Sequence, residues 1–213
     1  MTRLAFAGLF FLGITIAHAA SVEFQVADTK NAAVMDAVVS LVPVDAPAHL
    51  QPPVTPVEIM QRGEEFSPYV TPLVVGTAVS FPNRDTVQHH VYSLSKPKRF
   101  ELPLYAGEAK EAIVFDQPGV VVLGCNIHDW MSAYVVVLTT PWFAQTKADG
   151  RATIADVPAG RYRAEVWHPR LGKSETREVT VADGAAPVVF SLALKAERRI
   201  RRTPANGSHG YYK

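Results

Sequence analysis

Two apolar runs flank an eight-residue connection, Gly124-Cys-Asn-Ile-His-Asp-Trp-Met131. The first run, 120–123, ends just before it, and the second, 133–138, starts just after it. Both runs are rich in valine, whose branched side chain favours extended backbone. Apolar runs of this length, bounded by a short connection, are typical of neighbouring strands. This part of the chain is therefore expected to form a sheet, with the connection as a tight loop between two apolar strands.

The connection carries three side chains that can bind a metal. Cys125 is the only cysteine of the chain, and His128 and Met131 follow it at intervals of three residues. Thiolate, imidazole and thioether together select copper, in sites where two histidines and a cysteine lie in a plane with a weak axial methionine. A second histidine must therefore come from elsewhere in the chain.

The pair His89-His90 is the expected source of the second histidine. Successive side chains of a strand point to opposite faces of its sheet, so only one of the two can readily reach the Cys125 loop. We assign His89 as the ligand. His90 is expected to tie the ligand strand to the cysteine loop, and both His90 and Asn83 are kept as supporting residues or alternative ligands.

Each part of this pattern also has an ordinary explanation. A lone buried cysteine is most often a small apolar residue, adjacent histidines can lie on the surface, and a C-x-x-H pair can bind zinc. Closed zinc sites, however, use Cys, His or carboxylate ligands rather than Met. The ordered combination of F-P-N-x-D, a histidine and C-x-x-H-x-x-M favours one copper ion held by His89, Cys125, His128 and Met131.

The first 19 residues have the features of a secretory signal peptide. Arg3 precedes an apolar run over 4–16, and Ala17-His-Ala19 matches an A-x-A cleavage site. We expect cleavage after Ala19 and a periplasmic mature protein. Cysteines in an oxidising compartment usually pair, which a single cysteine cannot do within one chain. Copper coordination would protect this thiolate and account for its presence.

The rest of the chain shows strand and turn signals and no convincing helical pattern. We expect an all-β fold of two sandwiches. Residues 45–59 contain several prolines and predict a linker, and residues 60–139 form the copper unit. Residues 20–44 have little place in that unit and match the missing start of a second sandwich, which continues over 140–195. Insertion at a loop is tolerated because the chain ends of a domain often lie close together.

The copper unit resembles the type 1 (blue) copper proteins, the cupredoxins. The resemblance rests on Phe81-Pro-Asn-Arg-Asp85 with His89, and on the Cys125-x-x-His128-x-x-Met131 motif. The spacing is similar to that of amicyanin and pseudoazurin, and the wider context is similar to exported plastocyanin-like proteins labelled methylamine utilisation proteins. The resemblance covers about residues 60–138 and implies a Greek-key sandwich that holds one type 1 copper ion.

The flanking segments resemble a different family, the carboxypeptidase regulatory-like (transthyretin-like) sandwiches. The resemblance rests on residues 22–41, on Lys147-Ala-Asp-Gly-Arg-Ala-Thr-Ile154 and on Val157-Pro-Ala-Gly-Arg-Tyr162. It implies that the cupredoxin unit is either inserted between the second and third strands of this second sandwich or followed by it, and that the second sandwich has an immunoglobulin-like or transthyretin-like fold.

A closed set of four ligands favours one-electron transfer, because no ligand position is left open for a substrate. The cupredoxin resemblance implies that His128 turns its ring edge towards the surface. Asp129 and Trp130 flank it and are candidates for docking a redox protein partner, although Trp130 could equally cap the site. The alternatives are a periplasmic copper carrier or sensor, an enzyme, and a non-redox adaptor. We expect an electron carrier and not an enzyme.

Charge indicates little about further partners. The net charge is +1, so there is no strong global field, and we expect no nucleic-acid partner. The exception is the end of the chain, 196–213, where four arginines follow Lys195. We expect a basic flexible tail, whose candidate contact is an acidic protein or an anionic membrane surface.

Overall fold

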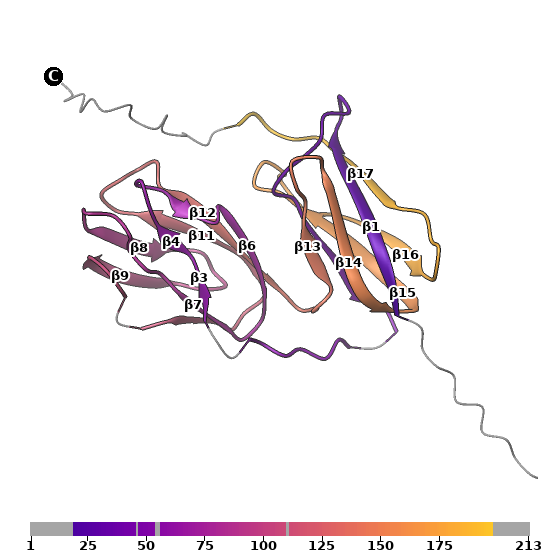
Figure 1. Cartoon of the computed structure of the whole chain (residues 1–213), viewed down its shortest axis with the longest axis horizontal. Coiled ribbons are helices and arrows are strands. Elements are labelled where there is room, and N and C mark those ends of the chain that lie inside the picture. Colours follow the sequence, from indigo (N-terminus) through magenta and orange to yellow (C-terminus); the bar gives the residue numbers. More distant parts are fainter. Residues whose placement is uncertain (1–18, 46, 54–55, 110, 198–213) are drawn as a thin grey trace, which may run out of the picture.

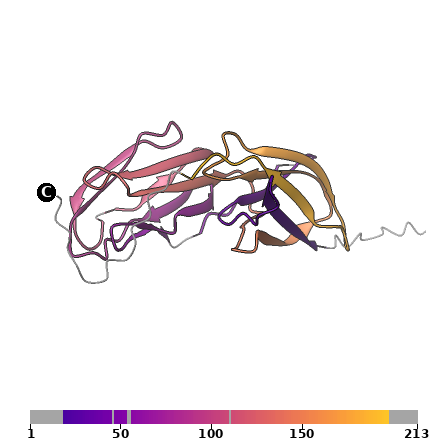
Figure 2. The same cartoon turned by 90° about the horizontal axis from the view of Figure 1, so that it is seen from above.

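The computed structural model describes residues 19–45, 47–53, 56–109 and 111–197. The described residues are all-β and form two sandwiches that lie end to end (Figures 1 and 2). None of them belongs to a helix long and apolar enough to cross a membrane. Most of the expected signal peptide and of the basic tail lies outside the described residues.

The sandwich on the right of Figure 1, here called the host sandwich, consists of two sheets around one core. Strand β1 is the centre of the first sheet, and its alternate residues Ala20, Val22, Phe24 and Val26 are buried, as the period of two requires. The first sheet has the order β14 (Arg151–Pro158), β1 (Ala19–Asp28) and β17 (Val188–Leu192). The second has the order β13 (Phe143–Gln145), β2 (Val38–Pro43), β15 (Gly160–Trp167) and β16 (Glu175–Val181).

Both sheets of the host sandwich combine strands from the two ends of the chain. Strand β1 pairs with β14 and β17, and β2 pairs with β13 and β15. The residues between β2 and β13 form a separate unit with its own core, here called the inserted sandwich. The chain therefore begins one sandwich, builds a second, and returns to complete the first. The family of the host sandwich stays a prediction.

The inserted sandwich places the apolar runs on either side of the Cys125 loop next to each other. Its larger sheet has the order β6 (Val70–Val74), β12 (Ser132–Leu138), β11 (Gly119–Cys125), β8 (His89–Ser93) and β9 (Phe100–Tyr105). The facing sheet has the order β10 (Ile113–Phe115), β7 (Thr77–Ser80) and β3 (Val57–Glu58), and β4 (Met60–Gln61) pairs with β5 (Phe66–Ser67). Strands β11 and β12 are antiparallel neighbours, so residues 126–131 connect the ends of adjacent strands.

Strand β12 is apolar over its last four residues, 135–138, because both of its faces are covered there. Val135 and Val137 point into the core of the inserted sandwich, whereas Val136 lies in a third cluster together with Val38 of the host sandwich. We call this third cluster the seam. It consists of Val38, Val70 and Val136, with Tyr69, Tyr134, Leu138 and Trp167 packed against them. A strand buried on both sides reads as a continuous apolar run.

The expected linker over 45–59 is wrong at its end. Val57–Glu58 forms β3, which pairs in parallel with β7, and Ile59 is fully buried in the core of the inserted sandwich. Prolines at 52, 53 and 56 favour an extended linker in this stretch. A strand of two residues is too short to show a period of two, so the sequence pattern did not reveal it.

Candidate metal centre

The three residues that come together at the candidate site lie at the ends of neighbouring strands. His89 is the first residue of β8, and Cys125 is the last residue of β11. These strands are antiparallel neighbours, with Cys125 opposite Val91. His128 comes from the connection that leads into β12. The β ladder therefore holds His89 and Cys125, while the short connection brings His128 to them.

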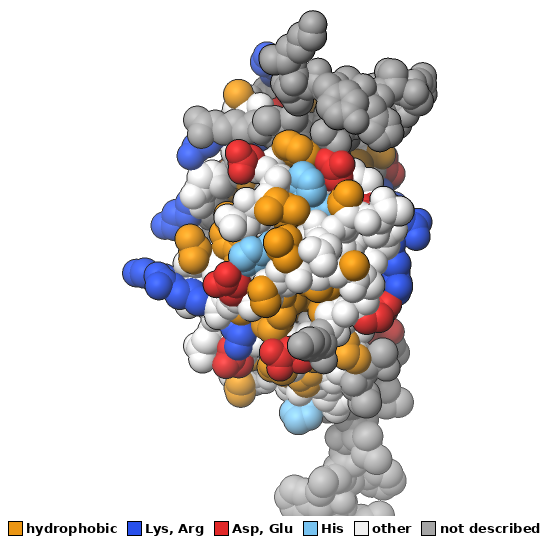
Figure 3. All heavy atoms as spheres, turned by 90° about the vertical axis from the view of Figure 1, so that its left-hand side faces the viewer, with side chains coloured by type: hydrophobic (Ala, Val, Ile, Leu, Met, Phe, Trp, Pro, Cys, Tyr) orange, Lys and Arg blue, Asp and Glu red, His pale blue; other side chains and the backbone are white. Residues whose placement is uncertain are grey.

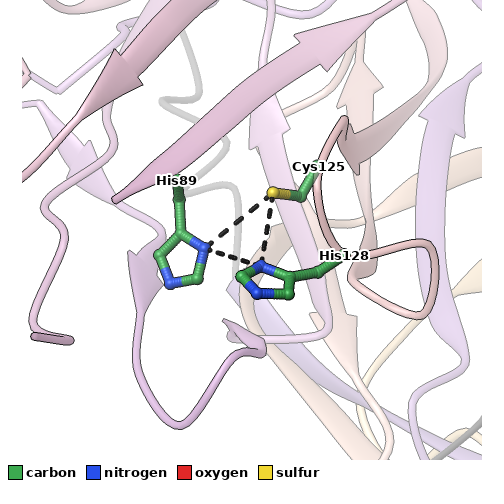
Figure 4. A group of neighbouring side chains, drawn as sticks. All are labelled: His89, Cys125 and His128. Atoms are coloured by element: carbon green, nitrogen blue, oxygen red, sulfur yellow. Dashed lines mark hydrogen bonds between the residues drawn. The ribbon is translucent and has the colours of Figure 1, made fainter. Parts of the chain in front are cut away.

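Their potential ligand atoms converge on one point. Cys125 Sγ lies 3.8 Å from His89 Nδ1 and 3.8 Å from His128 Nδ1, and the two Nδ1 atoms are 3.2 Å apart. Figure 4 shows the thiol and both imidazole rings facing one another. His89 is fully buried and Cys125 is 3% exposed, whereas the His128 side chain is 15% exposed. Within the described residues, these three form the cluster of His, Cys or carboxylate side chains that could hold a metal ion.

The spacing of these atoms fits a small divalent ion. Zinc binds nitrogen at about 2.0–2.1 Å and thiolate sulfur at about 2.3 Å. With bonds of that length and angles of about 100–120°, N–S edges are about 3.3–3.8 Å and N–N edges about 3.1–3.6 Å. The distances between Cys125, His89 and His128 match these edges. Thiolate and imidazole are also the donor types that suit copper, so the site fits that ion.

Asp85 determines which nitrogen of His89 faces the cluster. Its Oδ2 lies 2.8 Å from His89 Nε2. An ionised carboxylate can only accept hydrogen bonds, so Nε2–H must be the donor, and in neutral imidazole Nδ1 then carries a lone pair. Burial raises the pKa of Asp85, but hydrogen bonds from the Glu64 amide, His89 and the Gly63 amide outweigh burial and hold this pKa below its ordinary value. The carboxylate is therefore ionised at neutral pH.

Asn83 shapes the loop that carries Asp85 and His89. Its side-chain amide donates to the carbonyls of Val87 and Tyr105 at 2.9 and 3.0 Å, and its Oδ1 accepts from the Asp85 amide at 2.9 Å. Asn83 is 3% exposed, so each of these hydrogen bonds is shielded from water. The structure places Asn83 in a supporting position, at the start of the loop that leads to His89.

Tyr105 hydrogen-bonds to residues on both sides of this loop region, Gln61 and Phe81. Burial raises its pKa to about 12, so its hydroxyl stays protonated at neutral pH. It donates to the Phe81 carbonyl and accepts from Gln61 Nε2 at 2.6 Å. Strands β4 and β9 are thereby joined to the end of β7, immediately before Asn83.

His90 faces β9 in the structure, and its expected link to the cysteine loop stays a prediction. Its Nε2 lies 3.1 Å from Glu101 Oε1 on β9, and its ring packs against Tyr92, with centroids 5.9 Å apart. His89, Val91 and Ser93 of β8 are buried and His90 and Tyr92 are less so, so His90 lies on the face opposite to His89, as the period of two requires.

Met131, Trp130 and Asp129 follow His128 in the chain and differ in burial. Met131 is 2% exposed and belongs to the same core cluster as Cys125, and its amide donates to the His128 carbonyl at 2.9 Å. The Trp130 ring is partly buried against this core and lies 5.1 Å from the His128 ring, between centroids. Asp129 is exposed. Trp130 thus packs on His128 and covers part of it.

The surface around His128 is apolar. Ile127, next to it in the chain, is 47% exposed, and Val87 on the loop before His89 is 42% exposed. Figure 3 shows hydrophobic side chains gathered around histidines at this end of the inserted sandwich. Glu64 lies at the edge of His128, with its Oε2 3.9 Å from His128 Nε2. The least buried of the three converging side chains therefore has an exposed apolar neighbour in the chain, Ile127, and a carboxylate at its margin.

The supporting role of Asp85 was not predicted from the sequence, although Asp85 belongs to the F-P-N-x-D motif. Its spacing of four residues from His89 is a signal that could have drawn attention to it. The role of Glu64 carries no comparable signal, because it lies 64 residues before His128 and is brought there by the turn between β4 and β5.

Known structures resemble part of this chain. A copper-containing nitrite reductase from Thermus scotoductus SA-01 matches 45% of it at 29% identity with a TM-score of 0.38, and the match spans only 25% of that reductase. A purple cupredoxin from Nitrosopumilus maritimus matches 38% at 26% identity, over 99% of its own length, with a TM-score of 0.35. A reduced amicyanin variant matches 47% at 20% identity, over 98% of its length, with a TM-score of 0.36.

No protein-family model and no curated protein matches the chain. Because the structural matches are partial, the interpretation of the site rests on its own geometry. The decisive features are the convergence of Cys125 Sγ with the two Nδ1 atoms and the carboxylate that orients His89.

Proposed function

We propose that this chain is an exported type 1 copper protein of the cupredoxin kind that carries single electrons between redox partners in the periplasm. The observation that carries the proposal is the convergence of His89 Nδ1, Cys125 Sγ and His128 Nδ1 at edges that fit one ion. Met131 is the proposed axial ligand. Its burial in the same core cluster as Cys125 supports that role, as does its place three residues after His128.

A bound copper ion would supply exchange of one electron between its cuprous and cupric states. The protein's part is to keep the ligands in one arrangement. His89 and Cys125 lie on hydrogen-bonded strands, and His89 is also held by Asp85. Small ligand movement lowers the reorganisation needed when the charge of the site changes, and this favours rapid transfer.

His128 is the proposed exit for the electron. It is the most exposed of the three converging side chains, and exposed apolar residues lie on both loops of the site, Ile127 on the loop of His128 and Val87 on the loop before His89. Weak redox encounters use small interfaces, and such a surface suits brief contact with a redox protein. Trp130 and Asp129 lie beside His128 and would form part of this contact.

The test is to load the purified mature protein with cupric ion and record its visible spectrum and reduction potential. Intense thiolate-to-copper absorption with reversible one-electron cycling is expected. A Cys125→Ser variant should lose the absorption and keep the β-rich circular dichroism spectrum. A colourless wild-type protein would contradict the type 1 site. Rapid loss of copper to a competing chelator, with little redox cycling, would favour a copper carrier instead.

A further inference from the structure

The Asp85 carboxylate is held on two sides. The Gly63 amide donates to Oδ1 at 2.6 Å, the Glu64 amide donates to Oδ2 at 2.9 Å, and His89 Nε2 lies 2.8 Å from Oδ2. Its side chain is only 13% exposed. Asp85 thus connects the turn at residues 62–65 to a histidine of the candidate metal centre.

The turn presents these amides because of its backbone conformation. Gly63 and Glu64 both have positive φ angles, 63° and 55°. Non-glycine residues rarely adopt this region, and where they do the surroundings hold them in place. Here the two successive amides face one carboxylate, which stabilises the turn and fixes the carboxylate at the same time.

We propose that Asp85 is a positioning residue for His89, which holds the Nε2–H tautomer and adds a fixed negative charge that favours the cupric over the cuprous state. The proposal rests on the copper function proposed above. Its physical basis is general: a carboxylate that accepts from a metal-bound histidine fixes the ring and makes the other nitrogen more basic. A negative charge close to the centre also stabilises the more positive oxidation state.

The first test needs no copper. Nitrogen-15 NMR of the metal-free mature protein, at a pH well above the usual histidine pKa of about 6.5, reports which ring nitrogen carries the proton. For His89 the expected result is Nε2–H with an unprotonated Nδ1. In Asp85→Asn, the tautomer ratio should shift towards Nδ1–H. Nδ1–H as the main form in the wild type would overturn the proposal, whether or not the protein binds copper as proposed.

The second test compares copper affinities in both oxidation states. Loss of a carboxylate that orients a metal-bound histidine typically weakens metal binding 10- to 100-fold. Asp85→Asn should weaken cupric binding about tenfold more than cuprous binding, which corresponds to a rise of about 59 mV in reduction potential. Equal weakening of both states, with no change in potential, would overturn the charge effect.

Two matched variants separate this effect from others. Glu108→Gln removes a carboxylate from the surface of the same region, where Glu108 is 64% exposed and pairs with Arg84. Water screens the Glu108 charge, so the reduction potential of Glu108→Gln should stay close to the wild-type value. Gly63→Ala strains the turn, because Gly63 has a positive φ angle, but keeps the Asp85 charge, and no atom lies within 4 Å of the added Cβ.

Gly63→Ala should therefore lower the unfolding midpoint and raise the potential much less than Asp85→Asn does, because it keeps both the amide donor and the carboxylate charge. If it raised the potential as much as Asp85→Asn does, the effect would belong to the turn and the proposal would be wrong. If the wild type formed no blue site at all, the function proposed above would fail, while the tautomer measurement would still decide the position of the His89 proton.

Discussion

Tyr134 of β12 and Trp167 of β15 pack ring against ring across the seam, with centroids 5.5 Å apart. Tyr134 also meets Tyr69 edge-on at 5.5 Å, so three aromatic rings connect the two sandwiches. Strand β12 begins directly after Met131. The seam therefore joins the host sandwich to the strand that follows the candidate metal loop, and the two sandwiches are expected to support each other's stability.

Trp167→Ala tests that support. Full burial of such a ring is worth about 3–5 kcal/mol, and Trp167 is only partly buried, so we expect a loss of about 2–3 kcal/mol in the free energy of unfolding. In the wild type, urea should abolish the copper absorption and the far-UV signal in one transition. In Trp167→Ala the two transitions should either separate or move together to a lower urea concentration. Trp167→Phe, which keeps an aromatic ring, should lose less. Unchanged midpoints would show that the seam adds no stability.

Met131→Leu tests the proposed axial ligand. The two side chains have similar volumes, so the loss of stability should stay below about 1.5 kcal/mol. Cuprous copper is satisfied by three ligands, whereas cupric copper gains more from a fourth, weak axial donor, so removal of this donor should raise the reduction potential. A redox titration of the copper-loaded protein measures this. The matched control is Met35→Leu in the host sandwich, where Met35 is 52% exposed. The same potential in both variants would exclude Met131 as a ligand.

Much of the fold could be predicted from short-range patterns. Val22, Phe24 and Val26 alternate with polar residues, and that period alone predicts a half-buried strand. The lack of partners for residues 20–44 within the copper unit predicted their return to the C-terminal strands, as β1 and β2 now show. The spacing of Cys125 and His128 predicted their proximity, because a three-residue step keeps both in one loop.

What could not be predicted depends on how distant segments meet. Strand β13 at Phe143–Gln145 is too short for a period to show, and it is recognisable only by its pairing with β2. The apolar outer faces of β2 and β12 do not indicate which surfaces cover them. The pairing of His90 with Glu101 depends on the register between β8 and β9, and the hydrogen bond from the Gly63 amide to Asp85 spans 22 residues. These features follow from register and turn geometry.

His168 should make the stability of the host sandwich depend on pH. Burial lowers its pKa, and the nearby Arg170 lowers it further, below the usual value of about 6.5. Because the unfolded chain then binds the proton more readily, the contribution to stability is complete above about pH 6.5 and is lost as the pH falls from there through the folded-state pKa. Urea midpoints measured across this range should fall with pH. In His168→Gln this slope should be shallower, and an unchanged slope would assign it to other groups.

Ile127 should control electron exchange between copies of the protein without affecting the metal centre. It is 47% exposed and adjacent to His128, so Ile127→Lys places a positive charge in the proposed contact surface. When a cuprous and a cupric copy meet through this surface, the two like charges repel, and self-exchange should slow about ten- to a hundredfold at low salt. Added salt should restore part of the rate by screening.

NMR line broadening in mixtures of the two oxidation states measures the self-exchange rate. The visible spectrum of Ile127→Lys should match the wild type, because no ligand has changed. Leu94→Lys is the matched control: Leu94 is 73% exposed and directly follows β8, at the end opposite His89. At about 3.3 Å per residue it lies on the order of 16 Å from His89, outside the proposed contact. Equal slowing in both variants would mean that exchange does not proceed through the surface around His128.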